Sequence, residues 1–176
     1  MCGINGVFGL DKIAKPKQLI QCMNEALAHR GPDAEGCFVN DQVALGHRRL
    51  SIIDTSKKSN QPLFSKDHSI TLVFNGELYN YVELKEELRE FQFETSSDTE
   101  VLIAAYQKWG ISCMEKFNGM FGFALWDDNQ KALYIARDRI GIKPIYFYES
   151  DTHLVFSSEI RAMLKSGLVE KKLDKS

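Results

Sequence analysis

The chain has 176 residues, of which 44% are hydrophobic and 26% are charged, with a net charge of −2. This is the composition of one globular domain, and it lacks the basic surplus that binds nucleic acid or an anionic membrane. No run approaches the ~18–20 apolar residues of a membrane span and no secretory signal is visible, so we expect a cytoplasmic protein without nucleic-acid or membrane partners.

The first half of the chain predicts one helix among short strands. Apolar residues recur at helical spacing after Pro16, a good first-turn residue, and turn-forming residues follow at 29–33. The expected elements are a strand over residues 2–10, a helix over 16–28, strands over 35–40 and 42–47, and a polar loop over 54–65.

The second half predicts three helices and five strands. Asn80 with Glu83, and Ser97 with Glu100, have the spacing of capping boxes that begin helices. The expected elements are strands over 69–74, 120–126, 132–136, 144–148 and 153–157, and helices over 81–90, 98–109 and 159–165. This order favours an α+β sandwich of antiparallel sheets covered by helices.

The four cysteines show no C-x-x-C pair and no zinc-like spacing with histidine, so no metal site is expected. Three of them are predicted to be reduced, mostly buried thiols, namely Cys22, Cys37 and Cys113. Cys2 differs because of its position. If Met1 is removed, Cys2 carries both a thiol nucleophile and a free α-amine that can serve as its base. Reference pKa values of ~7.7–8.0 for the amine and ~8.5 for the thiol make this proton exchange easy.

The run Phe74-Asn75-Gly76-Glu77 follows a predicted strand, so Asn75 and Gly76 are expected where the chain reverses at the end of a sheet. An asparagine amide and a glycine N–H are suitable donors for an oxyanion. An ordinary Asn-Gly turn is the alternative.

Charged residues near two other strand and helix ends suggest a clamp for a free amino acid. One of Arg48 and Arg49 should point inward, where a guanidinium group binds a carboxylate through both oxygens. Asp98, with Glu77, would hold an ammonium group. Solvated arginines and simple helix capping are the alternatives. For residues 137–144 we favour a loop held by internal Arg–Asp pairs over a loop that lines a site.

Taken together, seven segments in this order resemble the class II glutamine amidotransferase domain, and most of all the glutaminase half of glutamine-hydrolysing asparagine synthetases. The segments are Met1-Cys2-Gly3-Ile4, His29-Arg30-Gly31-Pro32-Asp33, Arg49-Leu50-Ser51-Ile52, Asn75-Gly76-Glu77, Ser97-Asp98-Thr99-Glu100, Asn118-Gly119-Met120-Phe121 and Arg137-Asp138-Arg139-x-Gly-x-Lys-Pro.

The resemblance implies an N-terminal-nucleophile hydrolase fold, a four-layer αββα sandwich, and hydrolysis of L-glutamine to glutamate and ammonia. It implies that Cys2 is the nucleophile and that Asn75 and Gly76 form the oxyanion hole. It also implies a set of substrate-binding residues. These are Arg49 for the α-carboxylate, Leu50, Ser51, Ile52 and Ile53 along the pocket edge, Asn75 and Gly76 at the oxyanion hole, and Glu77 and Asp98 for the α-ammonium group.

The resemblance also predicts the organisation of the protein. Residues 1–168 would form the glutaminase domain, and residues 169–176 a charged linker or truncation point. A C-terminal or separate ATP-dependent synthetase domain would use the ammonia, because no Ser-Gly-Gly-x-Asp-Ser loop occurs here. No cofactor is expected in this domain, ATP and Mg being expected only for the synthetase domain. A homodimer is possible, and the acceptor is aspartate or another carboxylate such as a sugar acid.

Two further interpretations remain open. An N-terminal-cysteine acylase acting on larger amides would need an apolar acyl pocket in place of the clamp. A catalytically silent regulatory or scaffold domain would keep Met1 and so block the amine.

Overall fold

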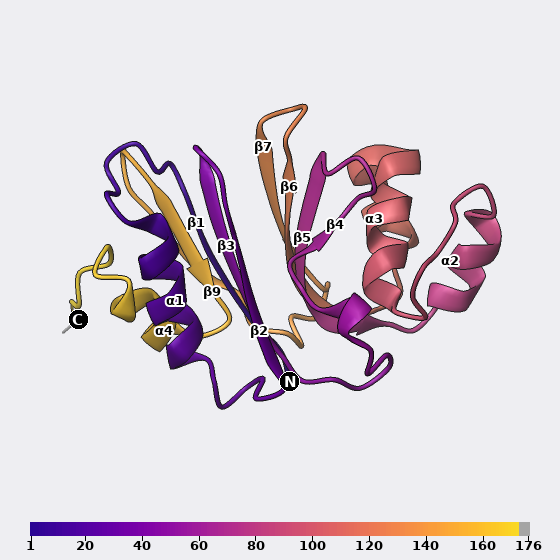
Figure 1. The fold of residues 1–176 in the computed structure, drawn as a ribbon, viewed down its shortest axis with the longest axis horizontal. Coiled ribbons are helices and arrows are strands. Elements are labelled where there is room, and N and C mark those ends of the chain that lie inside the picture. Colours follow the sequence, from indigo (N-terminus) through magenta and orange to yellow (C-terminus); the bar gives the residue numbers. More distant parts are fainter. Residues whose placement is uncertain (173–176) are drawn as a thin grey trace.

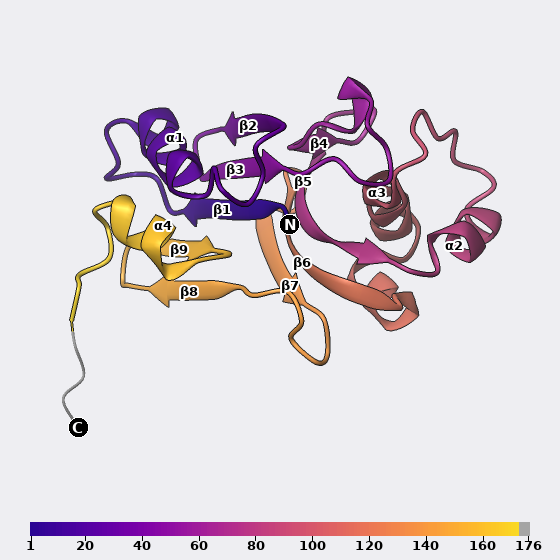
Figure 2. The ribbon, with the colours of Figure 1, turned by 90° about the horizontal axis from the view of Figure 1, so that it is seen from below.

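The structure is a computed structural model that describes residues 1–172. Two antiparallel sheets lie face to face (Figure 1). The five-stranded sheet has the order β2-β3-β1-β9-β8, with β2 at one edge and β8 at the other (Figure 2). Its strands are β1 (Gly3–Phe8), β2 (Ala34–Val39), β3 (Val43–Arg49), β8 (Tyr146–Glu149) and β9 (Leu154–Ser157). The four-stranded sheet has the order β4-β5-β6-β7 and contains β4 (Leu63–Phe64), β5 (Ile70–Leu78), β6 (Gly119–Asp127) and β7 (Ala132–Arg137).

Helices cover the outer face of each sheet, which confirms the predicted four-layer αββα sandwich (Figure 1). Helices α1 (Pro16–Ala26) and α4 (Ile160–Lys165) pack on the five-stranded sheet, and α2 (Tyr81–Glu87) and α3 (Asp98–Trp109) pack on the four-stranded sheet. Two short 3₁₀ helices, η1 (Lys57–Ser59) and η2 (Gly110–Lys116), complete the elements. No helix among residues 1–172 is both long and apolar enough to cross a membrane.

The strand period of two decides which side chains enter the space between the sheets. Ile4 of β1, Leu45 of β3 and Val73 of β5 belong to the core cluster in that space. Residues an even number of positions away on the same strands therefore face the same way. This places the predicted Cys2, Arg49, Asn75 and Glu77 at the inner face of the sheets.

Strand β6 is buried on both faces, as predicted for residues 120–126. Strand β5, in contrast, is longer than predicted. It continues to Leu78, and Asn75 and Gly76 pair with Gly122 and Phe121 of β6. The expectation that the chain reverses at Asn75 and Gly76 is therefore wrong, because pairing with the neighbouring strand outweighs the low strand preference of an Asn-Gly pair.

The capping boxes are only partly as predicted. The Ser97 side chain does accept from the Thr99 N–H, but Glu100 accepts from the N–H groups of Glu94 and Thr95 instead of that of Ser97. Asn80 makes no capping bond and instead binds the chain before β6, at Lys116 and Asn118.

Three smaller expectations also change. Cys113 is buried and Cys37 half-buried, but Cys22 is exposed, because it lies on the outer side of α1. The predicted loop over 54–65 contains η1 and the short strand β4. Of the predicted linker over 169–176, residues 173–176 lie outside the described part of the chain.

Candidate active site

A small cavity of about 90 Å³ is lined by residues of both sheets and by Met1. The N-terminus lies at one end of the space between the sheets (Figure 1). Chain segments from the start of α3 and from the loop after β7 also line the cavity. It brings together every predicted site residue except Ser51, namely Cys2, Arg49, Leu50, Ile52, Ile53, Asn75, Gly76, Glu77 and Asp98. The Ser51 N–H instead donates to Asp33 Oδ2 over 2.8 Å.

The Cys2 thiol is half-buried at the start of β1. The Leu50 N–H donates to its Sγ over 3.4 Å, and Arg30 Nε donates to the Cys2 carbonyl oxygen over 2.9 Å. Burial raises the pKa of the thiol above its ordinary value, although the Leu50 N–H and the charges of the N-terminus, Arg49 and Lys143 oppose the shift. A protonated thiol in this position needs a base before it can attack.

Asn75 offers an unused hydrogen-bond donor to the same cavity. Its side chain is only 2% exposed, and Nδ2 has no partner among residues 1–172. An orphaned buried amide donor is costly in a folded protein unless a ligand or water pairs with it. At the neighbouring position 76, only glycine fits the available space. A Cβ there would lie 2.5 Å from the Met120 carbonyl oxygen and 2.7 Å from Phe121 Cα.

Arg49 points inward, as predicted, but most of its guanidinium group is already engaged. Nη1 donates to Ser56 O and to Asn60 Oδ1, both over 2.7 Å, and Nη2 donates to Asp54 O. Since an arginine has five N–H donors, two remain for a ligand. Arg49 thus has two roles: it faces the cavity, and it fixes the loop over residues 54–60 at one side of the cavity.

Two carboxylates lie opposite. Asp98 Oδ2 accepts from the Leu78 N–H over 2.9 Å, which ties the first turn of α3 to β5. Burial first, and then the nearby charge of Glu77, raises the pKa of Asp98, with backbone N–H donors opposing. A positively charged ligand group between the two carboxylates would relieve this repulsion.

Lys143 also lines the cavity, although it is not among the predicted site residues. Residues 137–144 were expected to form a loop held by Arg–Asp pairs. In the structure Asp138 instead accepts from the backbone N–H groups of Phe121, Ile142 and Lys143. The predicted Arg–Asp pairing is therefore wrong for Asp138. The loop was also expected not to line a site, and this is wrong because Lys143 lines the cavity. The one available signal was a lysine embedded in a segment rich in glycine and proline.

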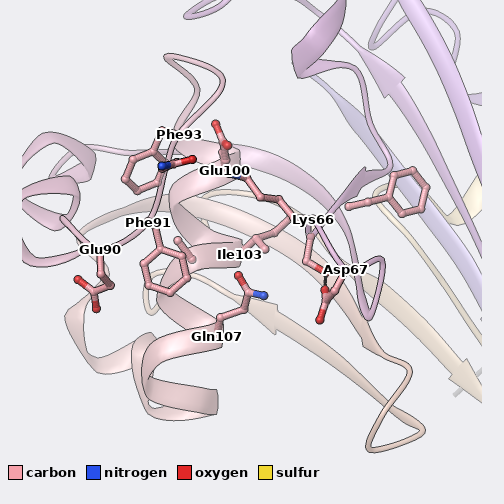
Figure 3. A pocket seen from close by; sticks show the side chains of 12 residues that line it. Lys66, Asp67, Glu90, Phe91, Phe93, Glu100, Ile103 and Gln107 are labelled. Atoms are coloured by element: carbon pink, nitrogen blue, oxygen red, sulfur yellow. Dashed lines mark hydrogen bonds between the residues drawn. The ribbon is translucent and has the colours of Figure 1, made fainter.

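A larger cavity of about 490 Å³ lies elsewhere, between α3, the segment before it and the β4–β5 turn (Figure 3). Several of its polar groups are paired with one another or with nearby backbone groups. Ser65 Oγ donates to Asp67, and Glu100 accepts from Glu94 and Thr95. It contains no cysteine or histidine, so the small cavity at Cys2 is the better candidate for chemistry. Across the described residues no cluster of three or more His, Cys, Asp or Glu side chains is arranged to hold a metal ion.

The chain is similar to known proteins over nearly its whole length. Residues 1–176 match the family model described as a glutamine amidotransferase domain. The putative asparagine synthetase [glutamine-hydrolyzing] 2 of Methanocaldococcus jannaschii is 41% identical over 192 residues, which covers 98% of this chain and 36% of the relative. The asparagine synthetase [glutamine-hydrolyzing] 1 of Bacillus subtilis is 44% identical over 169 residues, 93% of this chain and 27% of the relative. The chain therefore spans about a third of the length of these relatives.

A solved structure shares the fold. Glutamine phosphoribosylpyrophosphate amidotransferase from B. subtilis, in complex with ADP and GMP, superposes with a TM-score of 0.81 at 24% identity, covering 94% of this chain and 44% of that one.

Proposed function

Because the chain belongs to the glutamine amidotransferase domain family, we propose that it hydrolyses L-glutamine to glutamate and ammonia, with Cys2 as the nucleophile after Met1 has been removed. The observation that carries this proposal is the pairing, in one cavity, of the Cys2 thiol with the unpartnered amide of Asn75.

The α-amine of the mature Cys2 takes the thiol proton, and the thiolate attacks the carbonyl carbon of the side-chain amide. Asn75 Nδ2 and the Gly76 N–H donate to the oxyanion of the tetrahedral intermediate. The amine then returns its proton to the leaving nitrogen, and ammonia departs. Water attacks the resulting γ-glutamyl thioester, which releases glutamate and restores the thiol.

The substrate is held by charge at both ends of its amino-acid group. The two free N–H donors of Arg49 bind the α-carboxylate, and Glu77 with Asp98 binds the α-ammonium group. Leu50, Ile52 and Ile53 form the pocket edge, and Ser51 supports that edge through its bond to Asp33. A cavity lined by charged groups favours this substrate over the larger apolar amides of an acylase.

The test uses the mature protein, with removal of Met1 checked by intact mass. Cys2→Ala is expected to abolish ammonia release from glutamine while the melting temperature is retained. Labelling by 6-diazo-5-oxo-norleucine should add one adduct on residue 2 of the wild type, and excess glutamine should prevent it. Ammonia release by Cys2→Ala at the wild-type rate would refute the mechanism.

We further propose that residues 1–168 act with an ATP- and Mg-dependent synthetase domain that amidates aspartate, in the cytoplasm and without a cofactor of their own. The relatives are named as glutamine-hydrolysing asparagine synthetases, which supports the synthetase domain and the aspartate acceptor. Two exposed apolar side chains after β7 are available for contact with such a partner, Ile140 in the loop and Phe147 in β8, which are 87% and 67% exposed. In the protein that contains both units, Cys2→Ala should abolish asparagine formation from glutamine, and added ammonium should restore it. Failure of the rescue, or amidation of another carboxylate, would contradict the proposal. Whether the whole protein is a homodimer is measured by light scattering of the same sample.

A further inference from the structure

Lys143 is a buried cation without a counter-ion. Its residue is only 7% exposed, and no carboxylate among residues 1–172 forms an ion pair with it. In the described part of the chain, Nζ has one hydrogen-bond partner, the Met1 Sδ, at 3.4 Å. A buried ammonium group is costly unless something in the site makes use of its charge.

The backbone around Lys143 is held firmly. Asp138 accepts from the Lys143 N–H over 3.0 Å and from the Ile142 N–H over 2.8 Å, and it also accepts from Phe121 of β6. Burial raises the pKa of Asp138, but these backbone donors outweigh it and hold the pKa below its ordinary value. Asp138 therefore stays charged and keeps the loop on β6, so the position of Lys143 is set by the fold.

The partner of Lys143 is the residue that maturation removes. With Met1 gone, Nζ loses its contact and the α-amine of Cys2 becomes the chain terminus. Lys143 already acts on Cys2, since its charge opposes the rise in the pKa of the thiol. A nearby positive charge stabilises both a thiolate and a neutral amine.

We propose that Lys143 is a positioning residue of the glutaminase site, whose ammonium group faces the mature N-terminus and holds the α-amine of Cys2 in its neutral, proton-accepting form. The role in catalysis rests on the proposed function. The effect of Lys143 on the ionisation of Cys2 does not, and it can be measured separately.

Two other cations lie near Cys2, Arg49 and Arg30, and each has a different role. The charge of Arg49 also opposes the rise in the pKa of the thiol, and more strongly than that of Lys143, but its guanidinium group is fixed by the 54–60 loop and faces the proposed α-carboxylate of the substrate. Arg30 binds the Cys2 carbonyl oxygen and is paired with Glu159.

The carboxylates near Cys2 have the opposite effect on the α-amine to that of Lys143. Asp54, Glu77 and Asp98 line the cavity, and their negative charges favour a protonated amine. Lys143, whose Nζ contacts the residue that precedes Cys2, is the cation placed to offset them at the amine.

The experiment compares the mature wild type with Lys143→Met, Lys143→Arg and, as a matched loss of charge, Lys12→Met at an exposed position. The rate of Cys2 alkylation by iodoacetamide is measured against pH, which needs no glutamine. Lys143→Met should move the midpoint to higher pH by roughly one unit, as expected for a charge in a partly screened site, which slows alkylation about tenfold near neutral pH. Lys143→Arg should restore the wild-type midpoint, and Lys12→Met should leave it unchanged.

The pH profile of kcat/KM for glutamine is then measured on the same variants, and its acid limb should shift in parallel. A loss of rate that is equal at every pH, with an unmoved alkylation midpoint, would overturn the inference, as would a failure of Lys143→Arg to restore the midpoint. If Lys143→Met does not fold, Lys143→Gln gives the same reading. A shifted alkylation midpoint in a protein that does not hydrolyse glutamine would support the role of Lys143 and refute the proposed function alone.

Discussion

At the scale of single residues, the site combines a thiol that burial keeps protonated with donors and charges that lack a partner. The raised pKa of Cys2 makes a base necessary, and in the proposed mechanism the mature N-terminus supplies that base on the same residue. Asn75 Nδ2 and the two free donors of Arg49 are then available for the substrate. The polar groups that the fold leaves unsatisfied here are those that the proposed reaction requires.

Asn75 is predicted to act in the transition state more than in substrate binding. Asn75→Ala should lower kcat for glutamine by ~10²–10³, the usual effect of losing one oxyanion donor, with little change in KM. Steady-state kinetics checks this, with the melting temperature as the control for folding. A rise in KM at unchanged kcat would mean that Asn75 binds the ground state instead.

Asp98 is predicted to make glutamine binding sensitive to acid. Its pKa is raised, so its carboxylate becomes protonated at a higher pH than an ordinary aspartate at ~3.9, and the ammonium clamp weakens as the pH falls through that value. KM should therefore rise on acidification. Glu77→Gln removes a charge that raises the pKa of Asp98, so the rise in KM should move to lower pH. In Asp98→Asn, which can still accept from the Leu78 N–H, KM should be high and insensitive to pH. A pH-dependent KM in that variant would assign the effect to another group.

At the scale of secondary-structure elements, the first turn of α3 positions Asp98, and Ser97 caps that turn. Ser97→Ala removes the bond to the Thr99 N–H and should lower the free energy of unfolding by about 1 kcal/mol. It should also raise KM for glutamine, because Asp98 loses its fixed place against β5. Urea unfolding and kinetics measure the two effects. Ser97→Thr keeps the hydroxyl and should restore both, so an equal loss in Ser97→Thr would count against capping as the cause.

The elements show what local sequence can and cannot predict. The residues of α3 and β6 carry clear capping or apolar patterns, and both elements lie where they were expected. The end of β5 could not be predicted, because Asn75 and Gly76 remain in the strand only through pairing with β6, a partner over forty residues away. The predicted cap at Asn80 is wrong because of a similar contact with a distant part of the chain, since the Asn80 side chain binds the segment before β6.

The site residues also divide into those that local sequence indicates and those that depend on distant contacts. Cys2, Asn75, Glu77 and Asp98 were predicted because their residue types suit the chemistry. The resemblance to the family selected Arg49 over Arg48 and favoured these roles over the alternatives. Lys143 was missed because a lysine in a polar loop is usually solvated, and its burial depends on the distant bonds between Asp138 and β6.

At the scale of the whole molecule, the space between the two sheets changes from an apolar core to a polar site along its length. Ile4, Leu45, Val73, Trp126 and Phe156 fill the apolar part. His47 lies fully buried at the boundary, and its Nε2 lies 3.1 Å from the Phe74 carbonyl oxygen, so it joins β3 of one sheet to β5 of the other. Since an oxygen must accept, Nε2 carries the proton, and Nδ1 has no partner among the described residues.

This junction predicts that the two sheets separate more easily in acid. Burial lowers the pKa of His47 to about 3, against an ordinary value of ~6.5, so the fold accommodates only the neutral ring. A group with a lowered pKa of this kind contributes stability that is complete above pH ~6.5 and is lost as the pH falls towards 3. Between pH 7 and 5, His47 should cost the wild type about 2 kcal/mol of unfolding free energy, measured by urea denaturation. His47→Gln keeps a donor for Phe74 O but cannot titrate, so its stability should fall less over this range. His68→Asn, at an exposed position, should behave like the wild type. An equal loss in His47→Gln and the wild type would show that groups other than His47 cause the acid sensitivity.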